Sequence, residues 1–547
     1  MPLRQWKEVQ EMLRSRIISG RSALALLISG VSGWLCYTAF PPLAWSEAAW
    51  IAWVPLWLVC LRASVRDGFW RGFVAGAVFW LGTLFWLTEV TWAGWLMLSA
   101  YCALYMGAFG SLLAWCCRYW GYTRFRGRLG LMLGMPIVWA GLEFMRSTLL
   151  TGFAWNPLGN SQADKIALLQ IVAWTGVYGL SALIILVNGA IALTLQRYLA
   201  DGLRGRRPWH PELMVAFSVL LLVYLAGVQR LQADRALSTT PLRVALIQPN
   251  IPQYQKWTPE FVDSIYAQLE QLTTWAIQSG EPDLVVWPET AVPDYVRYSD
   301  RCFALVRDLT ALGAPILVGT MDIEWVDEGV PRFYNSALLF DQEGRLIDQY
   351  DKQHLVMFGE YVPLDRFLPF LTAMTPIEAS FDAGEGTTIF RVPERGDPFA
   401  VLICFEDTVA RLSRQAVRKG ARLLINQTNV AWFRERAAAA QHELHSRLRA
   451  AENGVPVARA ANTGVSSGID RVGRLQDILL GADGTHFVAG FQTTTLHIPP
   501  ADMPLTFYTR HGDVFGWVAL AFTFALAGAV VHQIRQSNRR ERTGDDL

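Results

Sequence analysis

The chain has 547 residues, of which 52% are hydrophobic and only 17% are charged. This charged fraction lies below the quarter that is usual for soluble proteins, so the composition favours a membrane protein with room for several domains. The formal net charge of +1 gives no reason to expect nucleic acid as a partner. The seven cysteines form no CxxC pair and no Cys/His cluster, so we expect no metal site. We expect no cofactor either.

Long apolar runs separated by short polar loops fill the first 230 residues. We predict seven transmembrane helices there and an eighth near the C-terminus, at about residues 22–40, 47–61, 70–88, 93–117, 129–145, 166–196, 212–229 and 514–534. The first run is too long for a signal-peptide core and is interpreted as an uncleaved helix. The run at 166–196 is long for one crossing, which indicates tilt or an extra interfacial turn.

Arginine and lysine are concentrated in every second loop. The N-terminal segment, the loops near 62–71, 118–128 and 197–207, and the C-terminal tail are basic, whereas the turns at 41–47 and 89–95 contain no basic residue. The positive-inside rule therefore predicts two cytoplasmic termini and an insert, about 231–513, on the opposite side. The aromatic loop 151–159 is expected on that side too, either as an interfacial belt or packed beneath the insert.

The insert alternates strand and helix patterns. Strands are predicted at 243–248, 284–287, 315–319, 335–340, 346–350, 400–403, 422–426 and 455–460, and helices at 259–278, 298–312, 408–419 and 437–452. The turn 341–344 predicts a hairpin, a second hairpin is expected near 470–473, and Gly420 and Gly454 are expected to end helices. We predict three parts: a membrane domain at 1–230, an α/β layered domain at 231–513, and a last helix with a basic tail at 514–547.

Three chemically suitable residues each stand at the edge of a predicted strand. Cys404 ends an apolar strand, Glu289 ends another, and Lys352 follows a third. A cysteine nucleophile needs a base to remove its proton and donors for the oxyanion that forms. Glu289 can be the base, and Lys352 with the backbone N–H of Phe405 can be the donors. The alternatives are that Cys404 is a small core residue and that the two charges form a structural ion pair.

At these residues the chain resembles the nitrilase, or carbon–nitrogen hydrolase, superfamily, whose Glu–Lys–Cys set lies on an α-β-β-α sandwich. The segments that carry this resemblance are 287–290, 350–363, 403–406, 426–433 and 460–464. With its flanking apolar helices, nearly the whole chain resembles the apolipoprotein N-acyltransferase family of bacterial membrane enzymes. The segments 248–257, 441–449 and 508–513 agree with that family as well.

The resemblance implies a role for each matching residue. It makes Glu289 the general base, Lys352 the oxyanion-stabilising lysine and Cys404 the nucleophile. It implies that Glu360 and Glu406 are accessory acids near the thiol. It places substrate contacts at Trp257 and on the loop with Asn429 and Trp432. The chain departs from many relatives at Phe405, where they have tyrosine, and at Val430, where they have aspartate, so substrate preference is affected more than activity.

The resemblance also implies a reaction and a location. An acyl chain would pass from a phospholipid, typically phosphatidylethanolamine, to Cys404 and then to the N-terminal diacylglyceryl-cysteine amine of an apolipoprotein. The enzyme would be a monomer in the bacterial inner membrane, with a periplasmic catalytic domain. The apolar segment 361–376 is either a lipid-dipping loop or a buried helix-turn segment. Competing interpretations are a membrane-tethered amidase acting on a soluble amide and a silent scaffold or transporter.

Overall fold

The computed structural model describes residues 23–201, 210–325, 329, 331–362, 380–434 and 436–543, with Asp201 and the last seven of these described by backbone only. These residues belong to two units, Met1–Gln229 with Asp513–Leu547, and Arg230–Gly512. Most of the predicted apolar loop at 361–376 and several basic residues of the predicted cytoplasmic segments lie outside the described residues.

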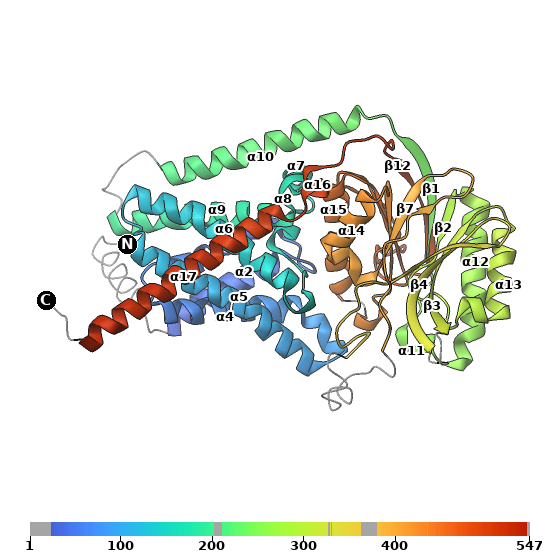
Figure 1. Ribbon diagram of the computed structural model, residues 1–547, viewed down its shortest axis with the longest axis horizontal. Coiled ribbons are helices and arrows are strands. Elements are labelled where there is room, and N and C mark those ends of the chain that lie inside the picture. The colour runs from blue at the N-terminus through green and yellow to red at the C-terminus, as the bar shows by residue number, and fades with distance from the viewer. Residues whose placement is uncertain are drawn as a thin grey trace. The chain divides into compact units, whose positions relative to one another are not determined.

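The first unit is helical (Figure 1). Five of its described helices are long and apolar enough to cross a membrane, by length and composition: Trp92–Tyr119, Phe125–Thr151, Val177–Ala200, Pro211–Arg235 and Val514–Gln536. Shorter apolar segments lie at Ala23–Thr38, Ser46–Cys60 and Ile166–Thr175. The helices are α2 (Ala23–Thr38), α3 (Val54–Cys60), α4 (Val65–Thr83), α5 (Trp92–Tyr119), α6 (Phe125–Thr148), α7 (Ile166–Leu169), α8 (Val172–Thr175), α9 (Val177–Asp201), α10 (Pro211–Arg235) and α17 (Val514–Thr543).

Two predicted apolar runs are not single helices. The run 47–61 is divided into the 3-10 turn η1 (Ser46–Trp50) and the seven-residue α3. The run 166–196 is divided into α7, α8 and α9, because Gly176 adopts a φ of +63° that ends α8. The extra turn that the length of this run indicated is therefore present, as two short helices that precede α9.

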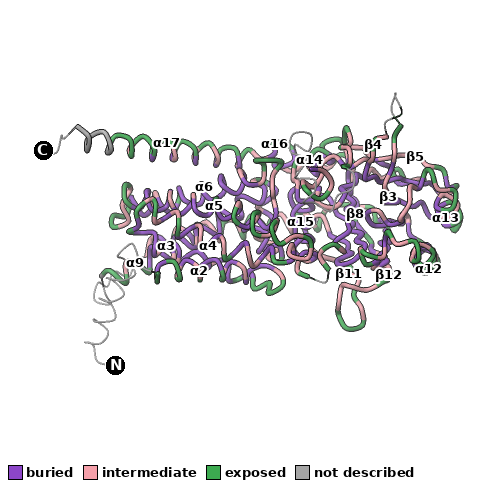
Figure 2. Tube along the Cα trace, turned by 90° about the horizontal axis from the view of Figure 1, so that it is seen from below, coloured by how far each residue is buried: buried purple, intermediate pink, exposed green. Residues whose placement is uncertain are grey.

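Aromatic and glycine residues set the packing inside this unit. On α4, a Cβ added at Gly72 would lie 2.1 Å from the carbonyl oxygen of Met106, so α4 and α5 meet backbone to backbone, as small residues allow in membranes. In the loop after α6, Trp155 is buried and the Arg146 guanidinium donates to its carbonyl oxygen at 2.9 Å. Residues 155–158 are therefore not an exposed interfacial belt. α17 is mostly exposed along its length (Figure 2), as a lipid-facing helix would be.

The described residues of the second unit form two six-stranded sheets. The first has the order β12-β1-β2-β3-β4-β5, with β1 (Thr240–Gln248), β2 (Leu284–Val286), β3 (Ile316–Trp325), β4 (Pro331–Phe340), β5 (Leu346–Asp351) and β12 (Gly490–Ile498). The second has the order β11-β10-β9-β8-β7-β6, with β6 (Phe390–Arg391), β7 (Pro398–Ile403), β8 (Leu423–Thr428), β9 (Val457–Ala461), β10 (Ser467–Ile469) and β11 (Leu475–Ile478). The sequence did not predict β6 and β12.

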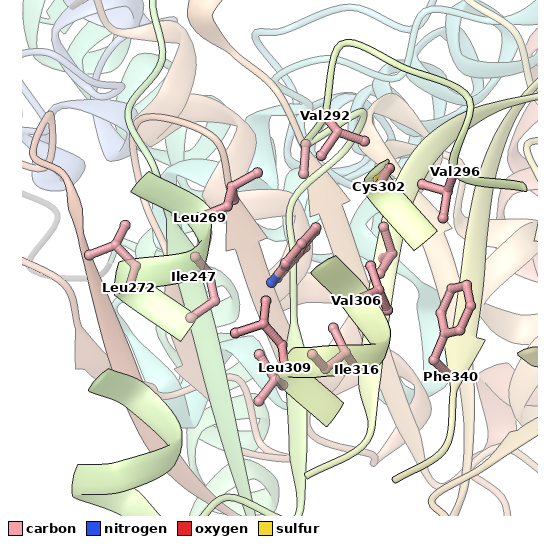
Figure 3. Packing of buried hydrophobic residues seen from close by; sticks show 14 of the residues in the cluster. Ile247, Leu269, Leu272, Val292, Val296, Cys302, Val306, Leu309, Ile316 and Phe340 are labelled. Carbon is pink, nitrogen blue, oxygen red and sulfur yellow. The ribbon is translucent and has the colours of Figure 1, made fainter. Parts of the chain in front are cut away.

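Helices cover the outer face of each sheet, so the unit is the predicted α-β-β-α sandwich (Figure 1). The helices are α11 (Gln253–Lys256), α12 (Val262–Gly280), α13 (Asp300–Thr310), α14 (Ala410–Arg418), α15 (Ala438–Asn453) and α16 (Phe507–His511). Figure 3 shows Leu269 and Leu272 of α12 and Val306 and Leu309 of α13 packed against the first sheet. The predicted apolar face of the helix at 259–278 is confirmed, because apolar residues at three- and four-residue spacing share one side.

Parallel pairing brings the ends of the central strands together. β1, β2 and β3 run parallel in the first sheet, and β7, β8 and β9 run parallel in the second. Gln427 of β8 donates from Nε2 to the carbonyl oxygen of Trp287, at 2.7 Å, and so joins the two sheets just beyond their core. Loops at the carboxyl ends of these strands are where functional side chains gather in α/β sheets.

Candidate active site

Cys404 stands at a sharp turn between β7 and the 3-10 turn η8 (Cys404–Thr408). Its φ is +53°, an uncommon value for a residue with a side chain and one found more often at active sites than elsewhere. Asn426 of β8 fixes this turn by donating from Nδ2 to the carbonyl oxygens of Leu402 and Cys404, at 3.0 and 3.1 Å. The residue as a whole is half-buried.

Glu406 holds the backbone around the thiol. Its carboxylate accepts from the backbone N–H of Ile403 at 2.8 Å, and from the backbone N–H groups of Gln353 and His354 at 2.7 and 3.0 Å. The Tyr350 hydroxyl donates to it as well, at 2.9 Å. Burial raises the pKa of Glu406, although the backbone donors lower it. Both oxygens are thus engaged in joining the cysteine turn to the segment that carries Lys352.

Lys352 lies between two carboxylates. Its Nζ is 2.7 Å from Oε1 of Glu360 and 3.5 Å from Oε1 of Glu289. Asn335 of β4 donates from Nδ2 to the same two oxygens, at 3.2 Å to Glu360 and 2.8 Å to Glu289. Glu360 is held further by the backbone N–H of Val356. Among the described residues, none donates to Oε2 of Glu289, so this carboxylate keeps one basic oxygen open.

The electrostatics of the thiol follow from this arrangement. Burial, with a smaller contribution from the Glu289 charge, raises the pKa of Cys404 to about 12, and Lys352 acts in the opposite direction. Burial lowers the pKa of Lys352, but Glu360, Glu289 and Cys404 outweigh burial and raise it well above its ordinary value. The thiol is therefore neutral at rest beside a charged ammonium, so a thiolate forms here only if a nearby base takes the proton.

The remaining predicted site residues lie on loops of the same unit. Phe405 follows the thiol, and its ring stacks on His354 with centroids 6.1 Å apart. Trp257, after α11, and Trp432, in the turn 431–433, are exposed. Asn429 is buried: it donates to Gln253 at 3.1 Å and accepts from Asn462 at 3.0 Å, so it fixes the loop that carries Trp432.

Several residues that organise the site were not singled out from the sequence. Asp407, next to Glu406, contacts His442 and Ser446 of α15 and Arg459 of β9, at 2.7, 2.6 and 3.1 Å. Arg459 also donates to Asn426, at 2.6 Å, so this network reaches the cysteine turn. One signal for these residues was present in the sequence: the polar pair Asn335-Ser336 interrupts the apolar strand β4. The charged residues of α15 are buried as well, which only the structure shows.

Comparisons with known proteins agree with this architecture. Residues 32–190 match the apolipoprotein N-acyltransferase N-terminal domain, and residues 243–498 match the carbon-nitrogen hydrolase domain. The apolipoprotein N-acyltransferase of Geobacter metallireducens is 37% identical over 90% of this chain and 93% of its own length. Those of Brucella melitensis and Rhodopseudomonas palustris are 32% and 29% identical, over 83% and 94% of this chain and 87% and 97% of their own lengths. The chain belongs to the apolipoprotein N-acyltransferase family.

Proposed function

We propose that this protein transfers an acyl chain from a phospholipid to the α-amine of the N-terminal diacylglyceryl-cysteine of apolipoproteins, through a thioester on Cys404. One observation carries the proposal: Lys352 contacts both Glu289 and Glu360, and all three charges act on the thiol of Cys404, which stands at a strained turn. Family membership supplies the donor and acceptor classes. We take phosphatidylethanolamine as the preferred donor.

The first half-reaction loads the thiol. Sγ of Cys404 attacks the ester carbonyl of the phospholipid while Glu289 accepts the thiol proton, because the thiol is protonated at rest. The Lys352 ammonium and the backbone N–H of Phe405 stabilise the oxyanion. The C–O bond of the ester then breaks, and the departing lysophospholipid oxygen takes the proton from Glu289.

The second half-reaction unloads it. The neutral α-amine of the diacylglyceryl-cysteine attacks the thioester carbonyl and passes a proton to Glu289. The C–S bond breaks, an amide forms, and the Cys404 sulfur recovers the proton. Glu360 keeps Lys352 in place in both steps through the 2.7 Å ion pair. Trp257 and Trp432 contact the lipid substrates, and Asn429 sets the loop that carries Trp432.

We also propose how the chain is placed. The first unit, which includes α17, crosses the bacterial inner membrane eight times, and the short Ser46–Cys60 segment is the second crossing. Both termini are cytoplasmic and the second unit is periplasmic, as the alternation of basic loops favours. One chain suffices for catalysis, because the thiol, the lysine and both carboxylates come from the same unit. A reporter enzyme that is active only in the periplasm should be active when it is fused after residue 45, 91 or 512.

Intact mass measurement tests the reaction. Purified protein in detergent is mixed with phosphatidylethanolamine and no acceptor, and wild type is compared with Cys404→Ala. We expect an acyl-sized mass gain on wild type alone, and its removal when a synthetic diacylglyceryl-cysteinyl peptide is added. Folded wild type that gains no mass would contradict the proposal. An adduct that water clears as fast as the peptide does would favour the membrane-tethered amidase.

A further inference from the structure

Lysine is scarce in this chain, and two of its lysines contact Glu289. Of the 48 lysine and arginine residues only five are lysines, at positions 7, 165, 256, 352 and 419. Lys352 is the one that contacts Glu289 and Glu360. Lys256, at the end of α11, is also buried, with 1% of its surface exposed. Burying an ammonium costs free energy unless hydrogen bonds or an opposite charge offset the loss of hydration.

Lys256 contacts the turn that carries Glu289. Its Nζ donates to the backbone carbonyl oxygen of Glu289 at 3.3 Å and to Oγ1 of Thr290 at 3.1 Å. Thr290 has a φ of +42°, which is unfavourable for a β-branched residue. An ammonium is compact and places several donors on nearby acceptors, whereas a guanidinium needs more room. The turn is therefore held in a strained form by a side chain suited to that task.

A second contact holds the same turn from β3. The backbone N–H of Ala291 donates to the carbonyl oxygen of Gly319 at 2.8 Å. A Cβ at Gly319 would lie 2.2 Å from the carbonyl oxygen of Pro288, so only glycine permits this approach. Strand β3 thus positions one side of the Glu289 turn and Lys256 the other. The contact from β3 is between uncharged backbone groups, whereas Lys256 also brings a positive charge close to Glu289.

We infer that Lys256 is a positioning residue for the general base, whose ammonium fixes the Glu289–Thr290 turn and favours the ionised Glu289 carboxylate. This inference rests on the proposed function, because it assigns Lys256 to the acylation of Cys404. Within the described ranges, the titratable groups that face Glu289 from other elements are the Lys352 ammonium and the neutral Cys404 thiol, with the Glu360 carboxylate beside Lys352. Lys256 adds a second positive charge to a site with two carboxylates.

Burial lowers the pKa of Lys256 to about 8, while the Glu289 charge acts in the opposite direction. Above that pH the positive charge is lost and the acylation rate should fall. Arginine keeps its charge over the whole range, so Lys256→Arg should lack this decline even where its rate is lower at neutral pH.

The test measures the single-turnover rate at which phosphatidylethanolamine acylates Cys404, by intact mass, from about pH 6 to about pH 10. Lys256→Met should acylate about 10- to 100-fold more slowly at neutral pH, with its acidic limb moved to higher pH, because a charge-assisted contact is lost. The lipid concentration for half-maximal rate should not change. Lys256→Arg should restore part of the rate and remove the alkaline decline. The matched control is Lys419→Met, which removes an exposed lysine of the same unit.

The outcomes separate this inference from the proposed function. Wild type that forms no acyl adduct defeats both. Wild type that acylates, together with a folded Lys256→Met whose rate and pH profile match it, defeats the inference alone, as does a slow variant with an unchanged pH profile. If Lys256→Met loses its thermal unfolding transition, Thr290→Val removes one acceptor of the same ammonium. It should then acylate several-fold more slowly, and an unchanged rate would overturn the inference.

Discussion

Two buried clusters of charge adjoin Cys404, and they differ in how fully their polar atoms are engaged. In one, Lys352 and Asn335 contact one oxygen of Glu289, and the described residues leave its other oxygen open. In the other, His442 contacts one oxygen of Asp407, and Ser446 and Arg459 contact the second. An open carboxylate oxygen is available to take a proton, whereas a fully engaged carboxylate stiffens the backbone. We therefore propose that the Glu289 cluster takes part in the reaction and that the Asp407 cluster supports the fold around it.

The largest effect should come from Glu289→Gln, which preserves the shape of the side chain but removes the proposed base. We expect the acylation rate to fall about 1,000- to 10,000-fold, the upper range for a lost general base. Thermal unfolding should change little, because the glutamine oxygen can still accept from Asn335. Single-turnover mass measurements and a melting curve on one preparation check both parts. A variant that melts far below wild type would place Glu289 in the supporting cluster.

The reverse result is expected for Asp407→Asn. The change leaves the Arg459 guanidinium buried without its anionic partner, so we expect a loss of about 3 kcal/mol in the free energy of unfolding. Whatever remains folded should still acylate Cys404 at a rate within about tenfold of wild type. Denaturant titration in detergent measures the stability. The matched control is Asp263→Asn, which breaks the exposed ion pair with Arg301 and should leave stability unchanged.

The contribution of the Asp407 cluster to stability should depend on pH in the acid range. Burial alone would raise the pKa of Asp407, but His442 and Arg459 outweigh burial and lower the pKa to about 2. A carboxylate with a depressed folded-state pKa stabilises the protein above its ordinary value of 3.8, and loses that contribution as the pH falls towards about 2. Unfolding followed between about pH 5 and about pH 2 should show roughly 2 kcal/mol less acid-dependent loss in Asp407→Asn than in wild type. Equal slopes would contradict this assignment.

The sequence predicted the parts of the fold that depend on local pattern. The strands that precede Glu289, Lys352 and Cys404 lie where apolar runs placed them, and the helices of the sandwich end at Gly420 and Gly454 as expected. The extra turn before α9 was expected from the length of its run, but the break at Gly176 was not located and the strand β12 was missed, because a backbone break at one glycine and a pairing between distant strands have no local period.

The functional residues followed the same division. Glu289, Lys352 and Cys404 stand out because each ends or follows an apolar strand, whereas the importance of Asn335, Asp407 and Lys256 arises from contacts across the fold. Glu406 was predicted as an accessory acid near the thiol, and its buried carboxylate accepts from the backbone N–H of Ile403, next to Cys404. Asn429 was predicted in substrate contact, but its buried side chain donates to Gln253. Type and spacing of residues identify reactive groups, but which group supports them depends on three-dimensional contacts.

The smallest effect should come from the exposed aromatic side chains. Trp257→Ala and Trp432→Ala remove rings that are about half exposed, so neither should change the melting temperature measurably. If these rings contact lipid, the phosphatidylethanolamine concentration for half-maximal acylation should rise about tenfold or less, because little apolar area is involved, while the maximal rate stays the same. Trp275→Ala is the matched control, since Trp275 is equally exposed but lies on α12, whose buried side packs on the first sheet. If Trp275→Ala raised that concentration as much, the effect would be general adhesion to detergent and lipid, and the two loop tryptophans would lose their assignment as substrate contacts.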